Sequence, residues 1–184
     1  MSELRAVLDT CVLVPKYLRD FLLRFALAEP MEWTYQPFWS SEIEIEFRRT
    51  LTNKNPPLTH QVIERILGLM NKQFPSASVD HQTFLPAAHQ LVLPDPDDYH
   101  VVAAALAAKA RAIVTFNHRD FPKDQMTKLN LEILSPHDLV ERVAKKFPNA
   151  VENTLNQMAD GYQSPPLSAN EIKAVLKKVN LDLP

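Results

Sequence analysis

The stretch from Leu93 to Phe121 constrains the fold of this chain most, because it places a buried helix and a short strand between two groups of polar residues. Val101 to Ala110 is a run of small and aliphatic residues that predicts a buried helix, and Ala112 to Thr115 is a short apolar strand. The polar residues at the two ends are Asp95, Asp97, Asp98, Asn117 and Asp120. A helix that folds back alongside its strand would bring these ends together, so a carboxylate site is the first hypothesis.

The composition is that of an ordinary soluble globular protein, with 46% hydrophobic and 23% charged residues among 184. No run of about 18 apolar residues predicts a membrane span, and the first residues lack the apolar stretch of a secretory signal. The single cysteine, Cys11, excludes an internal disulfide and a cysteine-based zinc cluster. We therefore expect a cytoplasmic protein with no membrane partner.

The formal net charge of −2 does not indicate a protein that coats nucleic acids through charge alone. The charge is unevenly distributed, however, since Tyr99 to Asn130 carries five basic residues against two acidic ones. If acids elsewhere are gathered around metal ions, their charge is cancelled locally, and basic residues such as Arg119, Lys123 and Lys128 dominate the field that a polyanion meets. A nucleic-acid substrate is therefore compatible with the sequence.

Short apolar runs and helical periodicities alternate along most of the chain. Strands are expected over residues 5–8, 33–38, 78–80, 112–115 and 131–134. Helices are expected over 15–28, from Ser40 or Ser41 onward, and over 59–74, 101–110 and 137–147. Pro37 marks the second strand as an edge strand or a strand end, because proline cannot donate to the ladder of a sheet.

Beyond Pro148 the composition becomes richer in Asn, Gln, Lys and Ala, and two further helices are expected over 150–159 and 168–179. Each carries one apolar stripe, so neither can stand alone, and both must pack on the domain, on a second copy or on a partner. We therefore divide the chain into a domain of residues 1–140 and a C-terminal helical extension of residues 141–184.

Asp9 stands directly after the first predicted strand. In parallel α/β sheets, ligands bind in the crevice beyond the carboxyl ends of the strands, so an acid at this position is aimed at a site. The alternative is that Asp9 caps the helix that begins after it, a role for which aspartate is well suited.

Three glutamates lie in the first two turns of the helix that begins at Ser40 or Ser41, where the helix dipole favours them whatever the protein does. Glu42 and Glu46 share one face, while Glu44 points elsewhere. Glu46 is flanked by Ile43 and Phe47, which puts its carboxylate close to an apolar stripe, where an unpaired charge is costly. Spacing alone leaves a functional and a structural role for Glu46 equally open.

Four acids are expected at one place: Asp9, Glu46, Asp98 and Asp120. Two carboxylates about 4 Å apart repel by about 1 kcal/mol at the dielectric constant of water, and by about 4 kcal/mol at an effective value of about 20. A hard divalent cation removes that cost, and oxygen ligands without cysteine or clustered histidine suit Mg²⁺ or Mn²⁺. The chemistry that follows is metal-dependent hydrolysis of a phosphodiester.

Four stretches that carry these residues stand in order along the chain: Ala6–Leu13, Ser40–Leu51, Asp95–Val101 and Ile113–Pro122. In this order they resemble the PIN domain nucleases, in particular the branch of VapC-like toxins from bacterial toxin-antitoxin pairs. The resemblance spans about Leu4 to Val140. It implies a three-layer α/β/α sandwich with a central parallel sheet, and metal-dependent cleavage of single-stranded or structured RNA as the activity.

The resemblance also implies which residues form the site. The metal-binding acids of the family fall on Asp9, Glu46 and Asp98, and a last position is shared between Asn117 and Asp120. Many relatives have an aspartate where this chain has Asn117, so either the amide coordinates the metal or its water, or Asp120 supplies the charge.

The expected partners follow from the same resemblance and from the distribution of charge. An RNA substrate would be held by basic residues beside the cleft, chiefly Arg119, Lys123 and Lys128. A VapC-like toxin implies an antitoxin encoded beside it. The C-terminal helices are expected to take part in that contact or in self-association into a homodimer, unless they pack back on their own domain.

Two other functions are alternatives to an active ribonuclease. A PIN fold that has lost catalysis could serve as an RNA-binding or scaffold module, although all the acidic positions are occupied here. A metal-dependent phosphatase for small molecules is disfavoured, because Gly68 and Gly161 are the only glycines and leave no glycine-rich phosphate loop.

Overall fold

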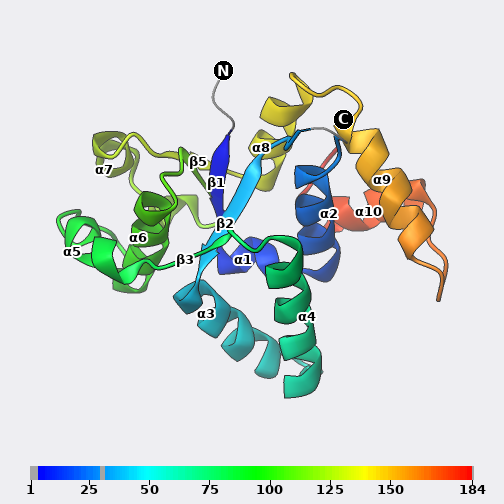
Figure 1. The fold of residues 1–184 in the computed structure, drawn as a ribbon, viewed down its shortest axis with the longest axis horizontal. Helices are drawn as coiled ribbons and strands as arrows, with labels where there is room; N and C mark the ends of the chain where they lie inside the picture. Colours follow the sequence, from blue (N-terminus) through cyan, green and yellow to red (C-terminus); the bar gives the residue numbers. More distant parts are fainter. Residues whose placement is uncertain (1–3, 30–31, 184) are drawn as a thin grey trace.

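The computed structural model of the chain describes residues 4–29 and 32–183. Its centre is a sheet of five parallel strands in the order β3-β2-β1-β4-β5 (Figure 1). The strands are β1 (Arg5–Leu8), β2 (Gln36–Ser40), β3 (Ser78–Val79), β4 (Ala112–Val114) and β5 (Glu132–Leu134). Because β1 lies in the middle of this order, its carboxyl end lies next to that of β4.

Helices cover both faces of the sheet, which confirms the predicted three-layer α/β/α sandwich (Figure 1). One face carries α6 (Tyr99–Ala107), and the other carries α2 (Lys16–Ala26) and α8 (Pro136–Ala144). The remaining helices are α1 (Thr10–Leu13), α3 (Ser41–Thr52), α4 (His60–Gln73), η1 (Gln82–Phe84), α5 (Leu85–Ala88), η2 (Pro96–Asp98), η3 (His118–Asp120), α7 (Lys123–Lys128), α9 (Ala150–Gly161) and α10 (Ala169–Lys178). Within residues 4–29 and 32–183, no helix is long and apolar enough to cross a membrane.

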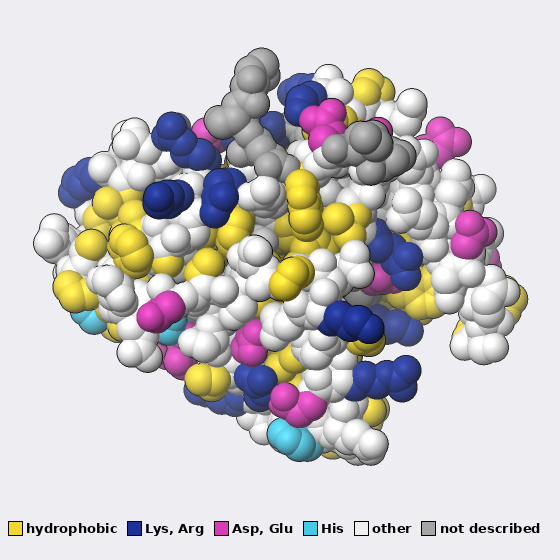
Figure 2. All heavy atoms as spheres, in the orientation of Figure 1, with side chains coloured by type: hydrophobic (Ala, Val, Ile, Leu, Met, Phe, Trp, Pro, Cys, Tyr) yellow, Lys and Arg dark blue, Asp and Glu magenta, His cyan; other side chains and the backbone are white. Residues whose placement is uncertain are grey.

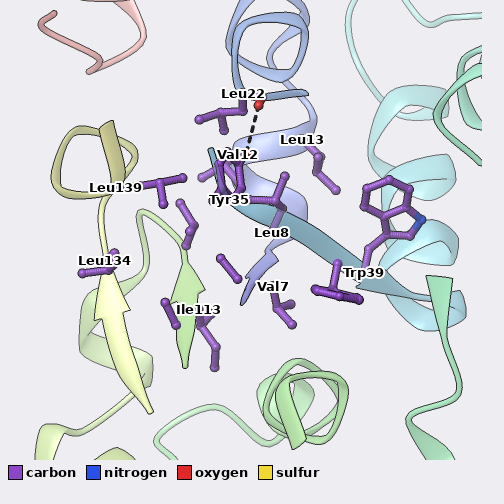
Figure 3. Close-up of a cluster of buried hydrophobic side chains, with 14 of the residues drawn as sticks. Val7, Leu8, Val12, Leu13, Leu22, Tyr35, Trp39, Ile113, Leu134 and Leu139 are labelled. Carbon is purple, nitrogen blue, oxygen red and sulfur yellow. Dashed lines mark hydrogen bonds between the residues drawn. The ribbon is translucent and has the colours of Figure 1, made fainter. Parts of the chain in front are cut away.

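The two central strands are apolar on both faces, as a parallel sheet covered by helices on both sides requires. Val7 and Leu8 of β1 and Ile113 of β4 are fully buried. Figure 3 shows these side chains packed with Leu22 of α2 and with a leucine of α8. The hydroxyl of the fully buried Tyr35 donates a hydrogen bond to the carbonyl oxygen of Leu22 at 2.9 Å, so this polar group is satisfied. The core thereby fixes the strands whose carboxyl ends carry the site.

The second strand begins and ends later than predicted. It lies inside the sheet, so the predicted edge strand is wrong, whereas the alternative of a strand end is confirmed, because Pro37 is the second residue of β2. Its Pro37 is nevertheless placed as the chemistry of proline demands. On one side Pro37 is in register with Ala6 of β1, while on the other side β3 pairs only with Trp39 and Ser40. Proline therefore stands on the part of β2 that has a single neighbour, where its missing N–H group costs no hydrogen bond to β3.

The C-terminal helical extension forms a further layer outside α2 (Figure 1). The apolar stripes of α9 and α10 are buried inside the chain: Val151, Leu155, Met158, Ile172 and Leu176. Polar contacts join the layer to α2 as well, since the hydroxyl of Tyr162 donates to Asp20 Oδ2 at 2.9 Å. The stripes therefore cover the chain's own surface, and they no longer give a reason of their own to expect a partner at these helices.

Candidate active site

A cleft of about 370 Å³ opens where the chain leaves the carboxyl ends of β1 and β4. Its lining residues are Asp9, Thr10, Cys11, Val14, Glu46, Arg49, Thr50, Asp95, Asp97, Asp98 and Asn117. Sequence segments that lie far apart thus meet at one edge of the sheet, which is where parallel α/β proteins bind their ligands. Three of the predicted site acids, Asp9, Glu46 and Asp98, are among them.

Asp9 directly follows β1 and is almost fully buried, with 4% of its surface exposed. Its backbone N–H donates to the carbonyl oxygen of Val114 at 3.1 Å, which fastens the end of β1 to β4. Its carboxylate Oδ2 accepts hydrogen bonds from the Thr115 hydroxyl at 2.6 Å and from the Cys11 thiol at 3.2 Å. Asp9 occupies the N-cap position of α1, but its side chain makes no capping hydrogen bond. Helix capping therefore does not explain this carboxylate.

The donors to Asp9 are themselves fixed. The backbone N–H of Asn117 donates to the Thr115 hydroxyl oxygen at 2.9 Å, so that hydroxyl links the carboxylate of Asp9 to the loop after β4. Burial, followed by the nearby Asp9 carboxylate, raises the pKa of the Cys11 thiol to about 12. The thiol therefore stays protonated at neutral pH and acts as a donor rather than as a nucleophile.

Glu46 on α3 reaches the same cleft with its side chain 33% exposed. Its Oε2 accepts a hydrogen bond from the Thr10 hydroxyl at 2.6 Å and lies 3.4 Å from Nε2 of His100. Burial acts to raise the pKa of Glu46, but the contacts with His100 and Thr10 outweigh it, so the pKa lies below its usual value. Glu44 instead binds Arg48 and Asn71, as its different helix face predicted.

His100 lies in the first turn of α6 and is a contact that the sequence did not reveal. Its Nδ1 lies 2.6 Å from the carbonyl oxygen of Asp97, and a carbonyl oxygen can only accept, so Nδ1 carries a proton. Its Nε2 faces the Glu46 carboxylate, although without the geometry of a hydrogen bond. Burial acts to lower the pKa of His100, but Glu46 raises it above its usual value, which favours the charged imidazolium.

Asp98 stands at the start of α6, and its side chain is half-buried in the cleft. Burial is the main cause that raises the pKa of Asp98 from 3.8 to about 7, followed by the charges of Asp9, Asp120 and Asp95. These carboxylates therefore repel one another, as expected for acids that share one cleft.

Asn117 lines the cleft, while Asp120 lies beside it in η3 and acts on Asp98 through its charge. The basic residues Arg119, Lys123 and Lys128 are exposed on η3 and α7 and do not line the cleft. They lie on the segment that connects β4 to β5, the strand at the edge of the sheet.

The oxygen atoms that line the cleft are of the kind that a hard divalent cation binds. Asp9, Glu46 and Asp98 offer carboxylate oxygens and Asn117 offers an amide oxygen, which are the ligands that Mg²⁺ and Mn²⁺ prefer. Burial and then the neighbouring carboxylates raise the pKa of Asp98, and such a cation would relieve the part that comes from repulsion. Within the described residues, no three His, Cys, Asp or Glu side chains stand close enough together to hold a metal ion. The residue types therefore fit, and the side chains would have to draw closer together to ligate an ion.

The residues that hold the acids in place were not predicted from the sequence: Thr10, Thr115 and His100. Two signals were available. Thr10 directly follows Asp9, and Thr115 ends the predicted strand whose polar end was assigned to the site. Nothing in the sequence points to the contact between His100 and Glu46, because it depends on how α6 packs against α3.

The raised pKa of Asp98 predicts how the stability of the metal-free protein depends on pH. The folded protein keeps the Asp98 proton up to about pH 7, whereas the unfolded chain releases it near 3.8. Between these values the folded state binds more protons, so the contribution of Asp98 to the free energy of unfolding falls as the pH rises and is lost above about pH 7. We expect the melting temperature in EDTA to drop more between about pH 5 and about pH 8 in the wild type than in Asp98→Asn. Parallel pH profiles of the two proteins would contradict this assignment.

Comparison with known proteins agrees with the geometry of the cleft. A family model described as the PIN domain matches residues 5–119. The chain is also 31% identical over 75 residues to a protein of Mycobacterium tuberculosis (strain ATCC 25618 / H37Rv) named "Putative ribonuclease VapC50". That alignment spans 41% of this chain and 44% of the relative, so the chain matches less than half of the length of that protein. Residues 5–119, which the family model matches, contain the ends of β1 and β4 and all the acids that line the cleft. The chain belongs to the PIN domain family.

Proposed function

We propose that this protein is a divalent-metal-dependent ribonuclease that hydrolyses phosphodiester bonds in RNA. The observation that supports it most is the meeting of Asp9, Glu46, Asp98 and Asn117 at one cleft, in a chain of the PIN domain family. Asp120 is proposed to add its charge from beside the cleft. The name of the Mycobacterium relative points to the same chemistry, RNA cleavage, for that protein.

The proposed roles of the residues follow from their contacts. Asp9, Glu46 and Asp98, with the amide of Asn117, would hold Mg²⁺ or Mn²⁺. When bound, such an ion would neutralise charge on the phosphate and activate a water for attack. Thr115 and Cys11 fix the orientation of the Asp9 carboxylate, and Thr10 and His100 fix that of Glu46. Both acids are thereby oriented before a substrate binds, which lowers the cost of organising the site.

The experiment that tests the proposal is incubation of purified protein with mixed single-stranded and structured RNA in Mg²⁺ or Mn²⁺, beside an EDTA control. Cleavage that depends on the metal would support the ribonuclease. Binding of RNA without cleavage would favour the inactive module instead. Cleavage that persists in EDTA would contradict metal dependence.

We further propose that Arg119, Lys123 and Lys128 contact the RNA backbone outside the cleft. Each is exposed, and phosphate contacts make binding depend on salt. Replacing Lys123 with glutamine should weaken binding of all RNA sequences alike and make the slope of log affinity against log salt shallower by about 1. Lys178→Gln on α10 serves as the matched control and should change neither. An unchanged salt slope in Lys123→Gln would place this residue outside the interface.

The finer part of the proposal is that this protein is the toxin of a VapBC-like pair and is restrained by an antitoxin. An unrestrained ribonuclease would harm its own cell. A groove of about 570 Å³ between α2, α4 and the end of α9 offers a surface for such a partner. Its apolar lining residues are Leu23, Leu27, Ile66, Leu69, Met70 and Phe74. Figure 2 shows Lys and Arg side chains along the border between α4 and α2, so the proposed antitoxin segment is apolar with acidic flanks.

This partner proposal predicts an effect for one surface leucine. Leu69 lies in the groove with 58% of its surface exposed, so Leu69→Glu should keep the fold but abolish co-purification with the product of the neighbouring gene. Val92→Glu is the matched control, because Val92 is 74% exposed and lies outside the groove, before η2. If Leu69→Glu retains its partner as well as Val92→Glu does, the groove is not the binding surface.

A further inference from the structure

One arginine stands in an acidic surrounding. Among the described residues that line the cleft, Arg49 is the only basic one, and it shares the lining with the carboxylates of Asp9, Glu46, Asp95, Asp97 and Asp98. Arg49 lies three residues after Glu46 on α3, a spacing that puts both side chains on one face of the helix. An RNA strand that enters the cleft therefore meets a single guanidinium among several negative charges.

The preceding residue, Arg48, has a different environment. Nε of Arg48 forms an ion pair with Glu64 at 2.7 Å, and its Nη2 lies 3.5 Å from Glu44, so Arg48 ties α3 to α4. In the described part of the chain the side chain of Arg49 makes no hydrogen bond or ion pair, and it is exposed. Two neighbouring arginines thus differ in whether their donors are already engaged.

Among the described residues, no ion pair neutralises the positive charge of Arg49 at the cleft. Arg49 lines the cleft together with Glu46, about one turn away on α3, and its side chain is exposed. The guanidinium is therefore close enough to act on the cleft electrostatically, while its donors stay available to a ligand. A guanidinium presents five N–H donors in a planar fork that matches two oxygens of one phosphate.

We propose that Arg49 binds the non-bridging oxygens of an RNA phosphate at the mouth of the cleft and so positions the strand for cleavage. This inference rests on the proposed ribonuclease function. RNA carries one negative charge on each phosphate, and the carboxylates of the cleft repel it. Because one guanidinium binds one phosphate, it favours one position of the RNA backbone in the cleft over the neighbouring positions. Arg119, Lys123 and Lys128 do not line the cleft, so their proposed contacts with the strand lie outside it.

The test compares Arg49→Gln and Arg49→Lys with wild type and with the matched control Arg48→Gln. Initial rates of cleavage of a fluorescent single-stranded RNA in Mn²⁺ give kcat and KM, anisotropy of the same RNA in EDTA gives Kd, and thermal melting reports the fold. We expect kcat/KM of Arg49→Gln to fall about 10- to 100-fold, the range for a charge-assisted hydrogen bond. Arg49→Lys should recover part of that loss, because it keeps the charge but not the fork.

The control separates substrate binding from stability. Arg48→Gln should keep kcat/KM, although its melting temperature falls through the loss of the ion pair with Glu64, while both Arg49 variants should melt as the wild type does. If the wild type cleaves RNA and Arg49→Gln has the same kcat/KM and Kd, this inference is wrong, while the proposed ribonuclease function still holds. A wild type that binds RNA without cleaving it overturns the ribonuclease, and Kd then still decides the role of Arg49. A wild type that neither binds nor cleaves RNA overturns both.

Discussion

Replacing Asp98 with asparagine is expected to abolish RNA cleavage and to leave the protein folded. Losing a group that only supports a metal ligand already costs about 10- to 100-fold, so losing a proposed ligand should lower the rate by more than about 100-fold. The side chain of Asp98 makes no hydrogen bond in the described part of the chain and does not cap α6. Its replacement by a neutral amide also removes the cost of burying a charge and the repulsion with Asp9, the two main causes of its raised pKa. The metal-free variant should therefore melt at the wild-type temperature or slightly above it.

Asp9→Asn is expected to abolish cleavage as well, with a smaller gain in stability, because its oxygen accepts hydrogen bonds from Thr115 and Cys11. Asp124→Asn on α7 serves as the matched control, since this exposed carboxylate lies outside the cleft and should cleave RNA normally. Cleavage rates in Mn²⁺ and melting temperatures in EDTA are the two measurements. A fall of many degrees in the metal-free Asp98 or Asp9 variant would mean that the carboxylate supports the fold, and the loss of cleavage would then say nothing about metal binding.

The fold was predictable where local pattern and tertiary packing demand the same residues. Val101 to Ala105 in α6 are buried on every side, and such a run of small aliphatic residues has few other places in a globular domain. The second strand was placed too early, because the aromatic residues of Trp33 to Tyr35 resemble a strand. Pairing with β1 sets the real register, with Arg5 opposite Gln36. Register depends on the partner strand, which a single segment of sequence does not contain.

Part of the site was also predictable from the sequence, and part of it depends on tertiary packing. Asp9 could be assigned from sequence because its position after a strand follows from the topology of parallel sheets. The contacts that orient it could not, since Thr115 lies 106 residues further along the chain. The sequence left Asn117 and Asp120 as alternatives for the last position of the site. In the structure Asn117 lines the cleft and Asp120 lies in the short helix η3, and which of them would bind a metal stays a prediction. Arg49 was hidden for another reason: its sequence context is that of an ordinary exposed arginine on a helix.

Removing the C-terminal helical extension is expected to destabilise the fold strongly. We propose that residues 141–184 act as a stabilising layer on the domain of residues 1–140. A chain truncated after Pro148 loses α9 and α10, whose buried apolar side chains each contribute about 1.5 to 3 kcal/mol relative to exposure. The surface of α2 that they cover would meet water. Because domains are stable by only about 5 to 15 kcal/mol, the truncated chain should melt far below the full chain or aggregate.

A pair of point variants on α9 makes the same argument without shortening the chain. Met158 is fully buried and Asn156 is exposed on the same helix, so Met158→Asp and Asn156→Asp add the same charge to opposite faces. Met158→Asp places an unpaired charge in an apolar contact and should lower the free energy of unfolding by more than about 3 kcal/mol, whereas Asn156→Asp should change it by less than about 0.5 kcal/mol. Thermal melting and light scattering measure both. If the truncated chain and Met158→Asp melt like the full wild-type chain, the extension does not stabilise the domain, and its helices would then need another role, such as the contact with a partner.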